Sequence, residues 1–454
     1  MAFRASLAQI VAILQPSQVT LPEPERLAVA TGLSTDTRQI QAGQVFVALR
    51  GETFDGHAFV AQAIAQGAIA ALVAEDAELP ADLPLIRVPD TLVAYQALGH
   101  WWRQQFAIPV VAVTGSVGKT TTKELIAAVL GQHGPVLKTQ ANYNNEIGVP
   151  KTLLELGPEH QFAVIEMGMR GPGEIALLCQ IASPTVGMIT NVGTAHIGRL
   201  GSEDAIARAK CELLAEMPAE SVAVLNGDNA RLMRTANTVW SGRTLSYGLE
   251  NGNFQGTVLP DGSLQVGDRL LPLPLSGEHN ALNYLGAIGV AEVLGLDWSG
   301  LQAGLAVELP GGRAQRHELA PDVVILDETY NAGLESMLAS LRLLAQTPGT
   351  RRLAVLGTMK ELGERSPEFH HQVGQAVQNL GLDGLLILAD PPEAAALASG
   401  AEPLVAEQFA DHAALVARLQ ALIQPGDRLL FKASRAVGLD RVVAELMDRW
   451  PAQS

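Results

Sequence analysis

The stretch VAVTGSVGKTTTKE, residues 111–124, decides the fold of this chain. Its first residues are apolar and β-branched, as in a buried strand, and a helical pattern begins at Lys119. Gly115 and Gly118 lie between them and let backbone N–H groups surround phosphate oxygens at the helix N-terminus. In such loops the lysine contacts the β- and γ-phosphates and the following hydroxyl binds Mg²⁺. The sequence therefore predicts an ATP-binding loop made of Thr114, Gly115, Ser116, Val117, Gly118, Lys119, Thr120 and Thr121.

The spacing of this loop is GxxGKT, because Val113 stands where the common phosphate-loop pattern has its first glycine. An ordinary glycine-rich turn between a strand and a helix is the alternative. The strand before the glycines and the Lys-Thr-Thr after them favour the phosphate-binding interpretation.

Apolar strands alternate with amphipathic helices from about residue 108 onward. The predicted strands are IPVVAVTG, FAVIEMG, TVGMITNVG and SVAVLN. This alternation predicts a largely parallel sheet that is covered by helices on both faces. Between residues 243 and 275, short strands and a PDG turn predict a β-meander, and the helical stretch HNALNYLGAIGVAEVL follows.

Three domains are expected in a chain of 454 residues, at about 150 residues per domain. Residues 1–90 predict a small mixed α/β domain, residues 91–310 a central P-loop ATPase-type domain, and residues 311–454 a Rossmann-like domain. The glycine-rich segment VELPGGRAQR is the predicted linker before the third domain. Beyond it the predicted strands are VVILD, RRLAVLG, LLILA, PLVA and DRLLFKA, and no GxGxxG follows the first of them, so a dinucleotide site is not supported.

Composition and charge narrow the class of protein. The formal net charge is -16, which argues against nucleic acid as a partner, because phosphate backbones require clustered Lys and Arg. No uncharged apolar run approaches the roughly 20 residues of a membrane helix, so an integral membrane protein is not expected. The apolar stretch in MAFRASLAQIVAILQPSQ is interpreted as a first amphipathic helix rather than a signal peptide. Cys179 and Cys211 are the only cysteines, which suits a cytoplasmic protein.

Three further residues are candidates for a metal site beside the loop. Glu166 ends the apolar strand FAVIEMG, and Mg²⁺ prefers carboxylate oxygens together with water and phosphate. His196 follows the next strand, and Lys210 lies on the helix ARAKCELL. Taken singly, these residues also fit a solvated carboxylate, a structural histidine and a surface lysine.

The order of these residues resembles that of the Mur ligases, the ATP-dependent amide-forming enzymes of peptidoglycan precursor synthesis. The similar features are TGSVGKTTT, Glu166 after its strand, His196 after the next one and Lys210 on the following helix. The resemblance implies that Thr120 and Glu166 bind one Mg²⁺. It further implies that His196 and a carbamylated Lys210 help to hold a second Mg²⁺, and that Lys119, His196 and Lys210 serve catalysis.

Further segments extend the resemblance over nearly the whole chain. They are STDTRQIQAGQVFVALRGETFDGHAF, NYNNEIGVPKTLL, GEHNALN, LDETYNAGLESM, VLGTMKELGERSPEFH and GDRLLFKASRAVGLDRVV. The residues implied to bind substrate are Ser34, Thr35, Asp36, Arg38, Asn142, Asn144, Asn145 and Glu146. Those implied to bind the nucleotide are Asn280, Asn283, Arg313, Asp327, Glu328 and Asn331, with Lys360, Lys432 and Arg435 as further basic candidates.

The chain departs from the family pattern at a few positions. Glu328 stands where a second Asp is usual, so the ribose contact is open between Asp327 and Glu328. Gly333 and Leu334 replace an Asn-Pro pair, and Ala433 replaces a glycine.

The resemblance implies an enzyme that joins D-Ala-D-Ala to UDP-N-acetylmuramoyl-tripeptide through an acyl phosphate, with ATP and Mg²⁺. A cytoplasmic monomer is expected. The alternatives are another muropeptide ligase, a folylpolyglutamate-type ligase, and a P-loop NTPase switch. The first domain argues against the folate enzymes, and the lack of an NKxD stretch argues against the switch. The sequence leaves open whether the third peptide residue is diaminopimelate or lysine.

Overall fold

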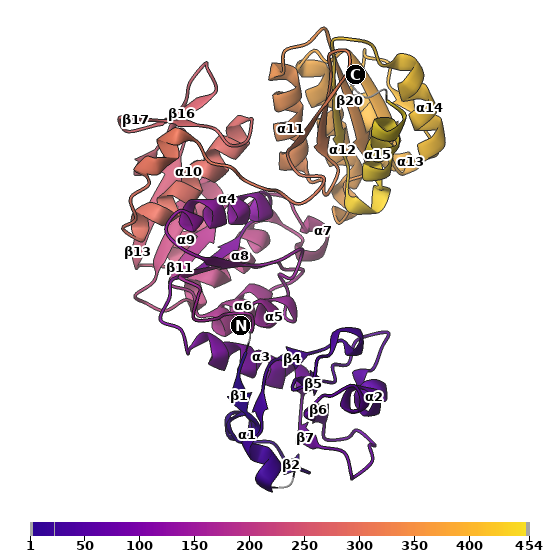
Figure 1. The fold of residues 1–454 in the computed structure, drawn as a ribbon. Helices are drawn as coiled ribbons and strands as arrows, with labels where there is room; N and C mark the ends of the chain where they lie inside the picture. Colours follow the sequence, from indigo (N-terminus) through magenta and orange to yellow (C-terminus); the bar gives the residue numbers. More distant parts are fainter. Residues whose placement is uncertain (1–2, 22, 451–454) are drawn as a thin grey trace.

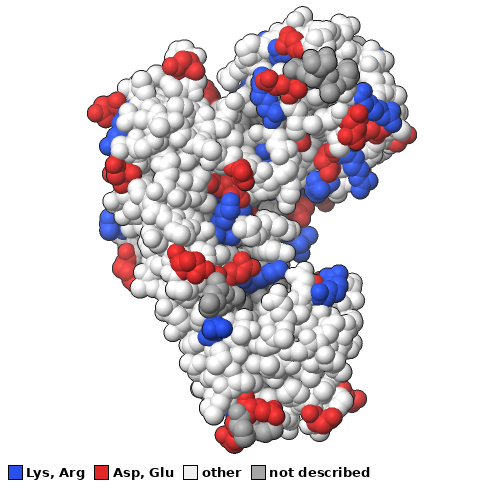
Figure 2. Space-filling model, in the orientation of Figure 1, with Lys and Arg blue, Asp and Glu red and all other residues white. Residues whose placement is uncertain are grey.

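The computed structural model describes residues 3–21 and 23–450, and Figure 1 shows three domains that follow one another in sequence order. The first domain lies at one end of the molecule and the third at the other. The face drawn in Figure 2 is hollowed between these two end domains. Among the described residues, we find no helix with the length and apolar character needed to cross a membrane.

The N-terminal domain is built on a five-stranded sheet with the order β2-β7-β6-β5-β4. Strands β4 to β7 are parallel, and β2 pairs with β7 in the antiparallel direction. The predicted amphipathic helix is present as α1, which Ser6 caps, while residues 1–2 of that prediction lie outside the described residues. The elements are β1 (Ala5–Ser6), α1 (Leu7–Leu14), β2 (Gln18–Val19), η1 (Glu23–Leu27), β3 (Val29–Ala30), β4 (Leu33–Ser34), η2 (Thr37–Gln39), β5 (Val45–Val47), η3 (Gly56–Phe59), α2 (Val60–Ala65), β6 (Ala70–Ala74) and β7 (Leu85–Val88).

The central domain contains a seven-stranded sheet with the order β14-β13-β12-β11-β8-β10-β9, in which every neighbouring pair is parallel. The phosphate-loop strand β8 lies inside this sheet, so the loop emerges at the carboxyl edge between two neighbouring strands. The elements up to β12 are α3 (Thr91–Arg103), β8 (Val110–Thr114), α4 (Lys119–Gly131), β9 (Val136–Lys138), α5 (Gly148–Leu153), β10 (Phe162–Glu166), α6 (Glu174–Ala182), β11 (Val186–Ile189), α7 (Ile197–Leu200), α8 (Glu203–Glu216) and β12 (Val222–Asn226). They are followed by α9 (Ala230–Val239), β13 (Arg243–Gly248), β14 (Phe254–Gln255), β15 (Thr257–Val258), β16 (Ser263–Val266), β17 (Arg269–Pro272), α10 (Glu278–Val293) and η4 (Ser299–Ala303).

Helices cover both faces of the central sheet, as the strand pattern predicts. Val111 and Val113 point to one face, where α4 and α10 pack, and Val110 and Ala112 point to the other, where α5, α6, α8 and α9 pack. This alternation explains why the strands are apolar at every position. The helices packed on the two faces of the sheet thus hold the loop between β8 and α4 in place.

The predicted meander over residues 243–275 is only partly correct. Strand β13 (Arg243–Gly248) continues the parallel sheet by pairing with β12, and β14 extends it. Only β15, β16 and β17 form the expected antiparallel unit. The loop between β12 and β13 contains helix α9, so the βα alternation continues one strand further than the sequence pattern indicates.

The third domain has a six-stranded sheet with the order β18-β19-β23-β20-β21-β22, in which only β18 is antiparallel to its neighbour. Two expectations need correction. Strand β18 begins at Gln315, inside the predicted linker, and the predicted strand PLVA is absent, since β22 lies at Glu407–Gln408. The elements are β18 (Gln315–Leu319), β19 (Val323–Glu328), α11 (Leu334–Gln346), β20 (Arg351–Gly357), η5 (Gly363–Arg365), α12 (Ser366–Asn379), β21 (Gly384–Leu388), α13 (Pro391–Gly400), β22 (Glu407–Gln408), α14 (His412–Leu422), β23 (Asp427–Lys432), η6 (Arg435–Val437) and α15 (Leu439–Arg449).

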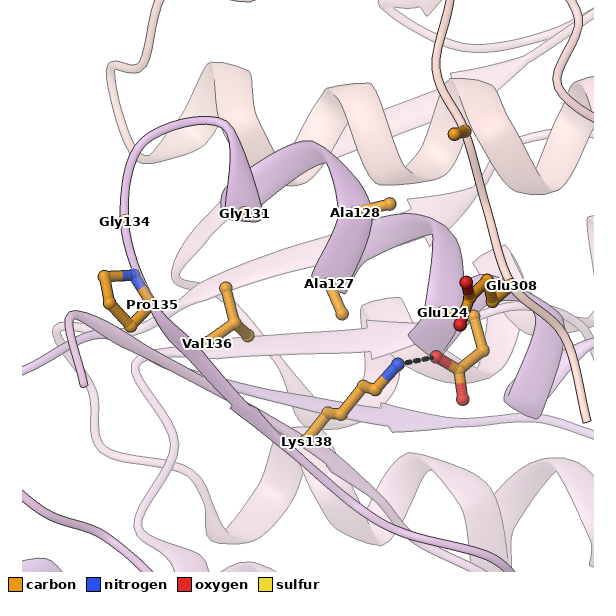
Figure 3. Close-up of a pocket in the computed structure, with 10 residues that line it drawn as sticks. Glu124, Ala127, Ala128, Gly131, Gly134, Pro135, Val136, Lys138 and Glu308 are labelled. Carbon is orange, nitrogen blue, oxygen red and sulfur yellow. Dashed lines mark hydrogen bonds and ion pairs between the residues drawn. The ribbon is translucent and has the colours of Figure 1, made fainter. Parts of the chain in front are cut away.

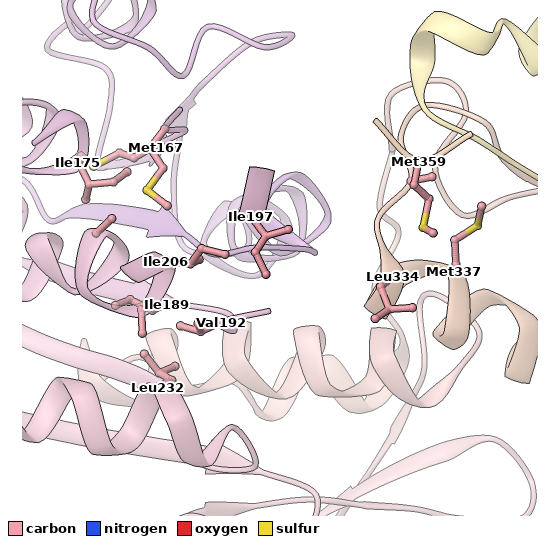
Figure 4. Close-up of a cluster of buried hydrophobic side chains, with 14 of the residues drawn as sticks. Met167, Ile175, Ile189, Val192, Ile197, Ile206, Leu232, Leu334, Met337 and Met359 are labelled. Atoms are coloured by element: carbon pink, nitrogen blue, oxygen red, sulfur yellow. The ribbon is translucent and has the colours of Figure 1, made fainter. Parts of the chain in front are cut away.

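The central and third domains share one cluster of buried apolar side chains. Figure 4 shows Val192 and Ile197 on the central side of this cluster and Leu334, Met337 and Met359 on the side of the third domain. The segments that carry these residues also carry predicted site residues.

Candidate nucleotide and metal site

The phosphate loop depends on two glycines with left-handed backbone angles. Gly115 has φ +155° and Gly118 has φ +81°. A Cβ at Gly115 would lie 1.9 Å from Oγ1 of Thr190, and a Cβ at Gly118 would lie 2.9 Å from Oδ1 of Asn283. Side chains at either position would therefore clash, and the loop can close tightly only with glycine. The same contact places Asn283, a predicted nucleotide-binding residue, directly beside the loop.

Two residues that sequence reasoning missed hold this loop. Asn191 accepts a hydrogen bond from Val117 N at 3.0 Å and donates one to the Val117 carbonyl at 3.0 Å. The Thr190 hydroxyl donates to the same carbonyl at 2.7 Å. Both follow β11 in TNVG, so their place at the end of the strand adjacent to β8 was the available signal.

Lys119 lies at the tip of the loop with its ammonium group turned toward the backbone. Its Nζ donates to the Gly115 carbonyl at 2.8 Å. Burial lowers the pKa of Lys119, Glu166 opposes that shift, and Arg313 adds to it. Glu166 and Arg313 therefore lie close enough to Lys119 for their charges to act on its ammonium group.

Glu166 is held so that one carboxylate oxygen stays free. Asn144 Nδ2 donates to Oε1 at 2.8 Å, and the Glu166 backbone N–H donates to Thr139 Oγ1 at 2.9 Å. The other oxygen, Oε2, is buried and has no hydrogen-bond partner in the part of the chain that the structure describes. A buried carboxylate oxygen without a partner is costly, and a hard cation satisfies it.

We expect Asn144→Ala to raise the Mg²⁺ concentration needed for half-maximal activity by about tenfold, because groups that orient a metal ligand affect metal affinity to that degree. The change removes the hydrogen bond to Oε1 of Glu166 and leaves the backbone unaltered. Titration of activity with Mg²⁺ at saturating ATP measures the effect. Gln140→Ala, an exposed change just before the same loop, is the control. Equal Mg²⁺ requirements in both variants and the wild type would refute the role given to Asn144.

Lys210 and His196 complete the central group. Lys210 is 1% exposed, and no hydrogen bond or ion pair involves its ammonium group among the residues described. Burial lowers the pKa of Lys210 well below its ordinary value, and the charge of Lys119 adds to this. Burial also lowers the pKa of His196, with Glu361 opposing it and Lys119 and Lys210 contributing further. The structure thus brings together Lys119, Glu166, His196 and Lys210.

The ligand set of this group is unusual for a metal site. Within residues 3–21 and 23–450, no three His, Cys, Asp or Glu side chains are placed to hold a metal ion. Glu166 supplies a carboxylate, His196 an imidazole and Thr120 a buried hydroxyl, and the Glu361 carboxylate lies against His196.

Side chains of the third domain reach the same region. The guanidinium of Arg313 lies 3.8 Å from the Tyr330 ring centroid, and its Nε is buried without a hydrogen-bond partner in the described residues. Lys432 donates to the Asn331 carbonyl at 3.0 Å and lies 3.7 Å from the Glu328 carboxylate. Burial lowers the pKa of Lys432. Arg313 and Lys432 therefore place two largely buried positive charges in this region, which suits an anionic ligand.

The two acidic candidates for the ribose contact differ in environment. Asp327 accepts hydrogen bonds from Thr329 N at 3.0 Å and Thr329 Oγ1 at 2.6 Å, so it shapes its own turn. Glu328 accepts from Ala314 N at 3.2 Å and borders a cavity of about 230 Å³. Ser276 also borders that cavity, and its carbonyl accepts a hydrogen bond from Asn280 at 2.8 Å.

Two other basic candidates of this domain are engaged elsewhere. Lys360 pairs with Asp390 at 2.5 Å, and Arg435 pairs with Asp440 at 2.9 Å. Arg435 also lies 5.9 Å from the centroid of the Tyr330 ring, the ring that the Arg313 guanidinium contacts.

His370 holds the segment that carries Lys360. Its ring is fully buried, Nδ1 donates to the Ser366 carbonyl at 2.7 Å and Nε2 accepts from Met359 N at 2.9 Å. Burial lowers the pKa of His370. A histidine in the unfolded chain has a pKa of about 6.5, so below that pH the unfolded chain binds more protons than the folded one. The free energy of unfolding therefore decreases as the pH falls below about 6.5.

We expect the amide of Met359 to lose protection against hydrogen exchange between pH 7.5 and pH 5.5, after correction for intrinsic rates. His370→Gln removes the titrating group, so the same amide should show a smaller pH dependence in that variant. Hydrogen exchange followed by mass spectrometry measures both. An identical pH dependence in the two proteins would contradict the assignment.

The predicted substrate residues of the first domain lie apart from the nucleotide group. Ser34 ends β4, and Thr35 follows it. Arg38 donates to Asp36 at 2.9 and 2.8 Å, and this bond lowers the pKa of Asp36 to about 2. Lys151 of α5 also lowers that pKa, so this end of the first domain faces the central domain.

The loop over residues 142–146 lies between these two regions. Asn144 reaches Glu166, whereas Asn145 accepts a hydrogen bond from Gly148 N at 2.9 Å and starts helix α5. The Glu146 carbonyl accepts from Gln96 of α3, and Asn142 is exposed. The loop therefore spans the distance from the first domain to the predicted metal site. Figure 2 shows the hollow, and Figure 1, in the same orientation, shows strand β4 and helices α5 and α7 on that side of the molecule.

A larger cavity of about 570 Å³ lies outside this site (Figure 3). It is bordered by α4, by β9, and by Ala306 and Glu308 at the start of the predicted linker. An ion pair of Glu124 with Lys138 closes one side of it. None of the predicted site residues lines it.

Fold and site together define a three-domain nucleotide-binding enzyme whose phosphate loop lies in the central domain. Family models match three parts of the chain: "Mur ligase family, catalytic domain" over residues 29–103, "Mur ligase middle domain" over 113–291 and "Mur ligase, glutamate ligase domain" over 312–435. The chain belongs to the Mur ligase family.

Curated relatives and solved structures agree with this assignment. The UDP-N-acetylmuramoyl-tripeptide–D-alanyl-D-alanine ligase of Synechocystis is 61% identical over 92% of both chains, and that of Escherichia coli is 39% identical over 92% of this chain and 93% of its own. A crystal structure of MurF from Acinetobacter baumannii has a TM-score of 0.88 at 34% identity, covering 99% of this chain and 100% of that one. MurF ligase from Thermotoga maritima in complex with ADP has a TM-score of 0.82 at 31% identity, covering 94% and 99%.

Proposed function

We infer that this chain is an ATP-dependent ligase that joins D-Ala-D-Ala to the carboxyl end of UDP-N-acetylmuramoyl-tripeptide, which gives a pentapeptide precursor of peptidoglycan. The observation that carries this function is the group of Lys119, Glu166, His196 and Lys210 at the carboxyl edge of the sheet, in a chain 61% identical to a ligase of that name. The relatives are matched over all three domains, including the first.

The chemistry requires activation, because a carboxylate is a poor electrophile. A carboxylate oxygen of the tripeptide attacks the γ-phosphorus of ATP, which gives an acyl phosphate and ADP. The amine of D-Ala-D-Ala then attacks the carbonyl carbon, and the tetrahedral intermediate releases phosphate. The protein aligns the reactants and neutralises concentrated negative charge. Lys119 and Arg313 supply that positive charge to the phosphates.

Thr120 and Glu166 would hold a first Mg²⁺, which fits the free Oε2 of Glu166. His196 and a carbamylated Lys210 would hold a second one. When bound, Mg²⁺ neutralises phosphate charge and polarises the phosphoryl group. Burial lowers the pKa of Lys210, so its neutral amine is suited to attack the carbon of CO₂ and to release a proton, and the resulting carbamate would supply the missing negative charge.

The roles proposed for the remaining site residues follow from where these residues lie in the structure. Ser34, Thr35, Asp36 and Arg38 would seat the UDP-sugar, and residues 142–146 would guide the peptide toward Glu166. Asn280, Asn283, Asn331 and one of Asp327 and Glu328 would contact the nucleoside, with Glu328 favoured because it borders the cavity beside Ser276. The domains would divide near residues 90 and 310, and Gly312, with φ +71°, would allow the third domain to turn. We further propose a monomer that works in the cytoplasm.

Mass spectrometry of the reaction products tests this function. UDP-MurNAc-tripeptide, D-Ala-D-Ala, ATP and Mg²⁺ together should give UDP-MurNAc-pentapeptide, and omission of any one should abolish it. Parallel reactions with the diaminopimelate and the lysine tripeptides identify the accepted third residue. Ligation of single amino acids instead of the dipeptide would point to another muropeptide ligase.

A folylpolyglutamate-type activity is less favoured. A Mycobacterium tuberculosis folylpolyglutamate synthase structure has a TM-score of 0.61 at 17% identity, which is a likeness of fold alone. Incubation with a folate and glutamate should give no product.

A further inference from the structure

The third domain touches the central domain at the segment that carries His196. Gly198 N donates to the Glu361 carbonyl at 3.2 Å. A Cβ at Gly198 would lie 2.6 Å from Gly363 N, so the two backbones approach as closely as two glycines permit. Residues 193–200 of the central domain and 358–363 of the third domain are therefore in close backbone contact.

The Glu361 side chain lies against the imidazole of His196. Its Oε2 is 2.5 Å from Nδ1 of His196, and its Oε1 is 3.8 Å from the Arg199 guanidinium. This carboxylate is the group that approaches Nδ1, which has no other hydrogen-bond partner among the described residues. It leaves Nε2 as the ring nitrogen that Glu361 does not approach.

Both partners of this contact have a left-handed backbone. His196 has φ +66° and Glu361 has φ +65°. Such angles cost energy in residues with side chains, and they persist where the surroundings impose them, often at functional sites. In both residues the strained backbone holds the side chain at the domain contact.

We propose that Glu361 is a positioning residue for His196: it fixes the proton on Nδ1, leaves Nε2 free for the cation, and so makes the second cation site depend on the approach of the third domain. Histidines that bind metals usually donate their other ring N–H to a carboxylate or carbonyl, which fixes tautomer and ring orientation. The inference rests on the proposed function, because that function makes His196 a metal ligand.

A second carboxylate separates orientation of His196 from simple docking of the domains. Glu335 accepts hydrogen bonds from Thr194 N at 2.7 Å and from Thr194 Oγ1 at 3.2 Å. It therefore holds the same segment of the central domain without touching the imidazole. Glu335→Gln weakens the domain contact and leaves the partner of His196 in place.

The first measurement is the ¹⁵N spectrum of histidine rings in the full-length protein, with His196→Gln used to assign the His196 signals. The wild type should carry the proton on Nδ1. Glu361→Ala should move it toward Nε2, whereas Glu361→Gln, whose amide oxygen still accepts, and Glu335→Gln should keep it on Nδ1. Glu364→Gln, at an exposed neighbouring position, is the matched control.

The second measurement is Mn²⁺ binding in the presence of ADP, followed by electron paramagnetic resonance. Glu361→Ala should weaken binding at one site by about tenfold or more, and Glu361→Gln should restore most of it. An unchanged tautomer together with unchanged Mn²⁺ binding in Glu361→Ala would overturn the inference, as would a wild-type proton on Nε2. Neither readout requires turnover, so failure of the proposed ligase reaction is detected separately by the product assay.

Discussion

Lys119→Ala is expected to lower ATP-dependent product formation by about a hundredfold to a thousandfold or more, the range found when a single donor to developing charge is removed. Within residues 3–21 and 23–450, the ammonium group makes hydrogen bonds only to carbonyls of its own loop, Gly115 and Ser116, so its loss leaves the packing of β8 and α4 intact. Product formation at saturating substrates measures the effect, and circular dichroism monitors the fold.

Lys119→Arg is the informative companion of this variant. It keeps the charge but replaces a compact ammonium by a planar fork that does not fit the same loop, so low activity is expected there too. Turnover close to that of the wild type in a folded Lys119→Ala protein would remove the phosphate loop from the mechanism.

Lys210→Ala is expected to lose activity by about a hundredfold and to regain part of it when a short carboxylic acid such as acetate is added. The side chain is buried and its ammonium group has no hydrogen-bond or ion-pair partner in the described part of the chain, so truncation leaves a space in which a small carboxylate would replace the proposed carbamate. Removal of a metal ligand or its support costs about this much. Activity at increasing acetate concentrations, at low bicarbonate, measures the rescue.

Arg208→Ala lies on the same helix but is exposed, so it should keep activity and show no response to acetate. Full activity of Lys210→Ala at low bicarbonate would contradict the carbamate, and so would equal stimulation of both variants by acetate.

Much of the fold and part of the site could be predicted because they depend on short-range patterns. The glycines and lysine of the loop stand between a strand and a helix, and Glu166 ends a strand adjacent to β8. Residues at the carboxyl ends of neighbouring parallel strands meet, so their association follows from strand order. The roles of Asn280 and Arg313 came from family resemblance and remain proposals.

The residues that the sequence did not reveal act through contacts across the fold. Thr190 and Asn191 shape the loop from a strand that follows it by more than seventy residues, as the separation of 74 between Val117 and Asn191 shows. Glu361 meets His196 only because two domains dock. Sequence periodicity carries no signal for such pairs.

The wrong strand prediction at PLVA has a physical reason. These apolar residues lie before the sheet edge, where β22 pairs over only two residues, Glu407 and Gln408, with β21. Val405 is 86% exposed, so the apolar character of this segment does not report burial in a strand.

The central claim is that the tripeptide carboxylate is activated as an acyl phosphate at the site of Lys119, Glu166 and Lys210. Tripeptide labelled with ¹⁸O in both oxygens of its terminal carboxylate tests this most directly. One labelled oxygen should appear in each phosphate released with the pentapeptide, since the attacking carboxylate oxygen leaves with phosphorus. Unlabelled phosphate released with a labelled pentapeptide carbonyl would contradict the account.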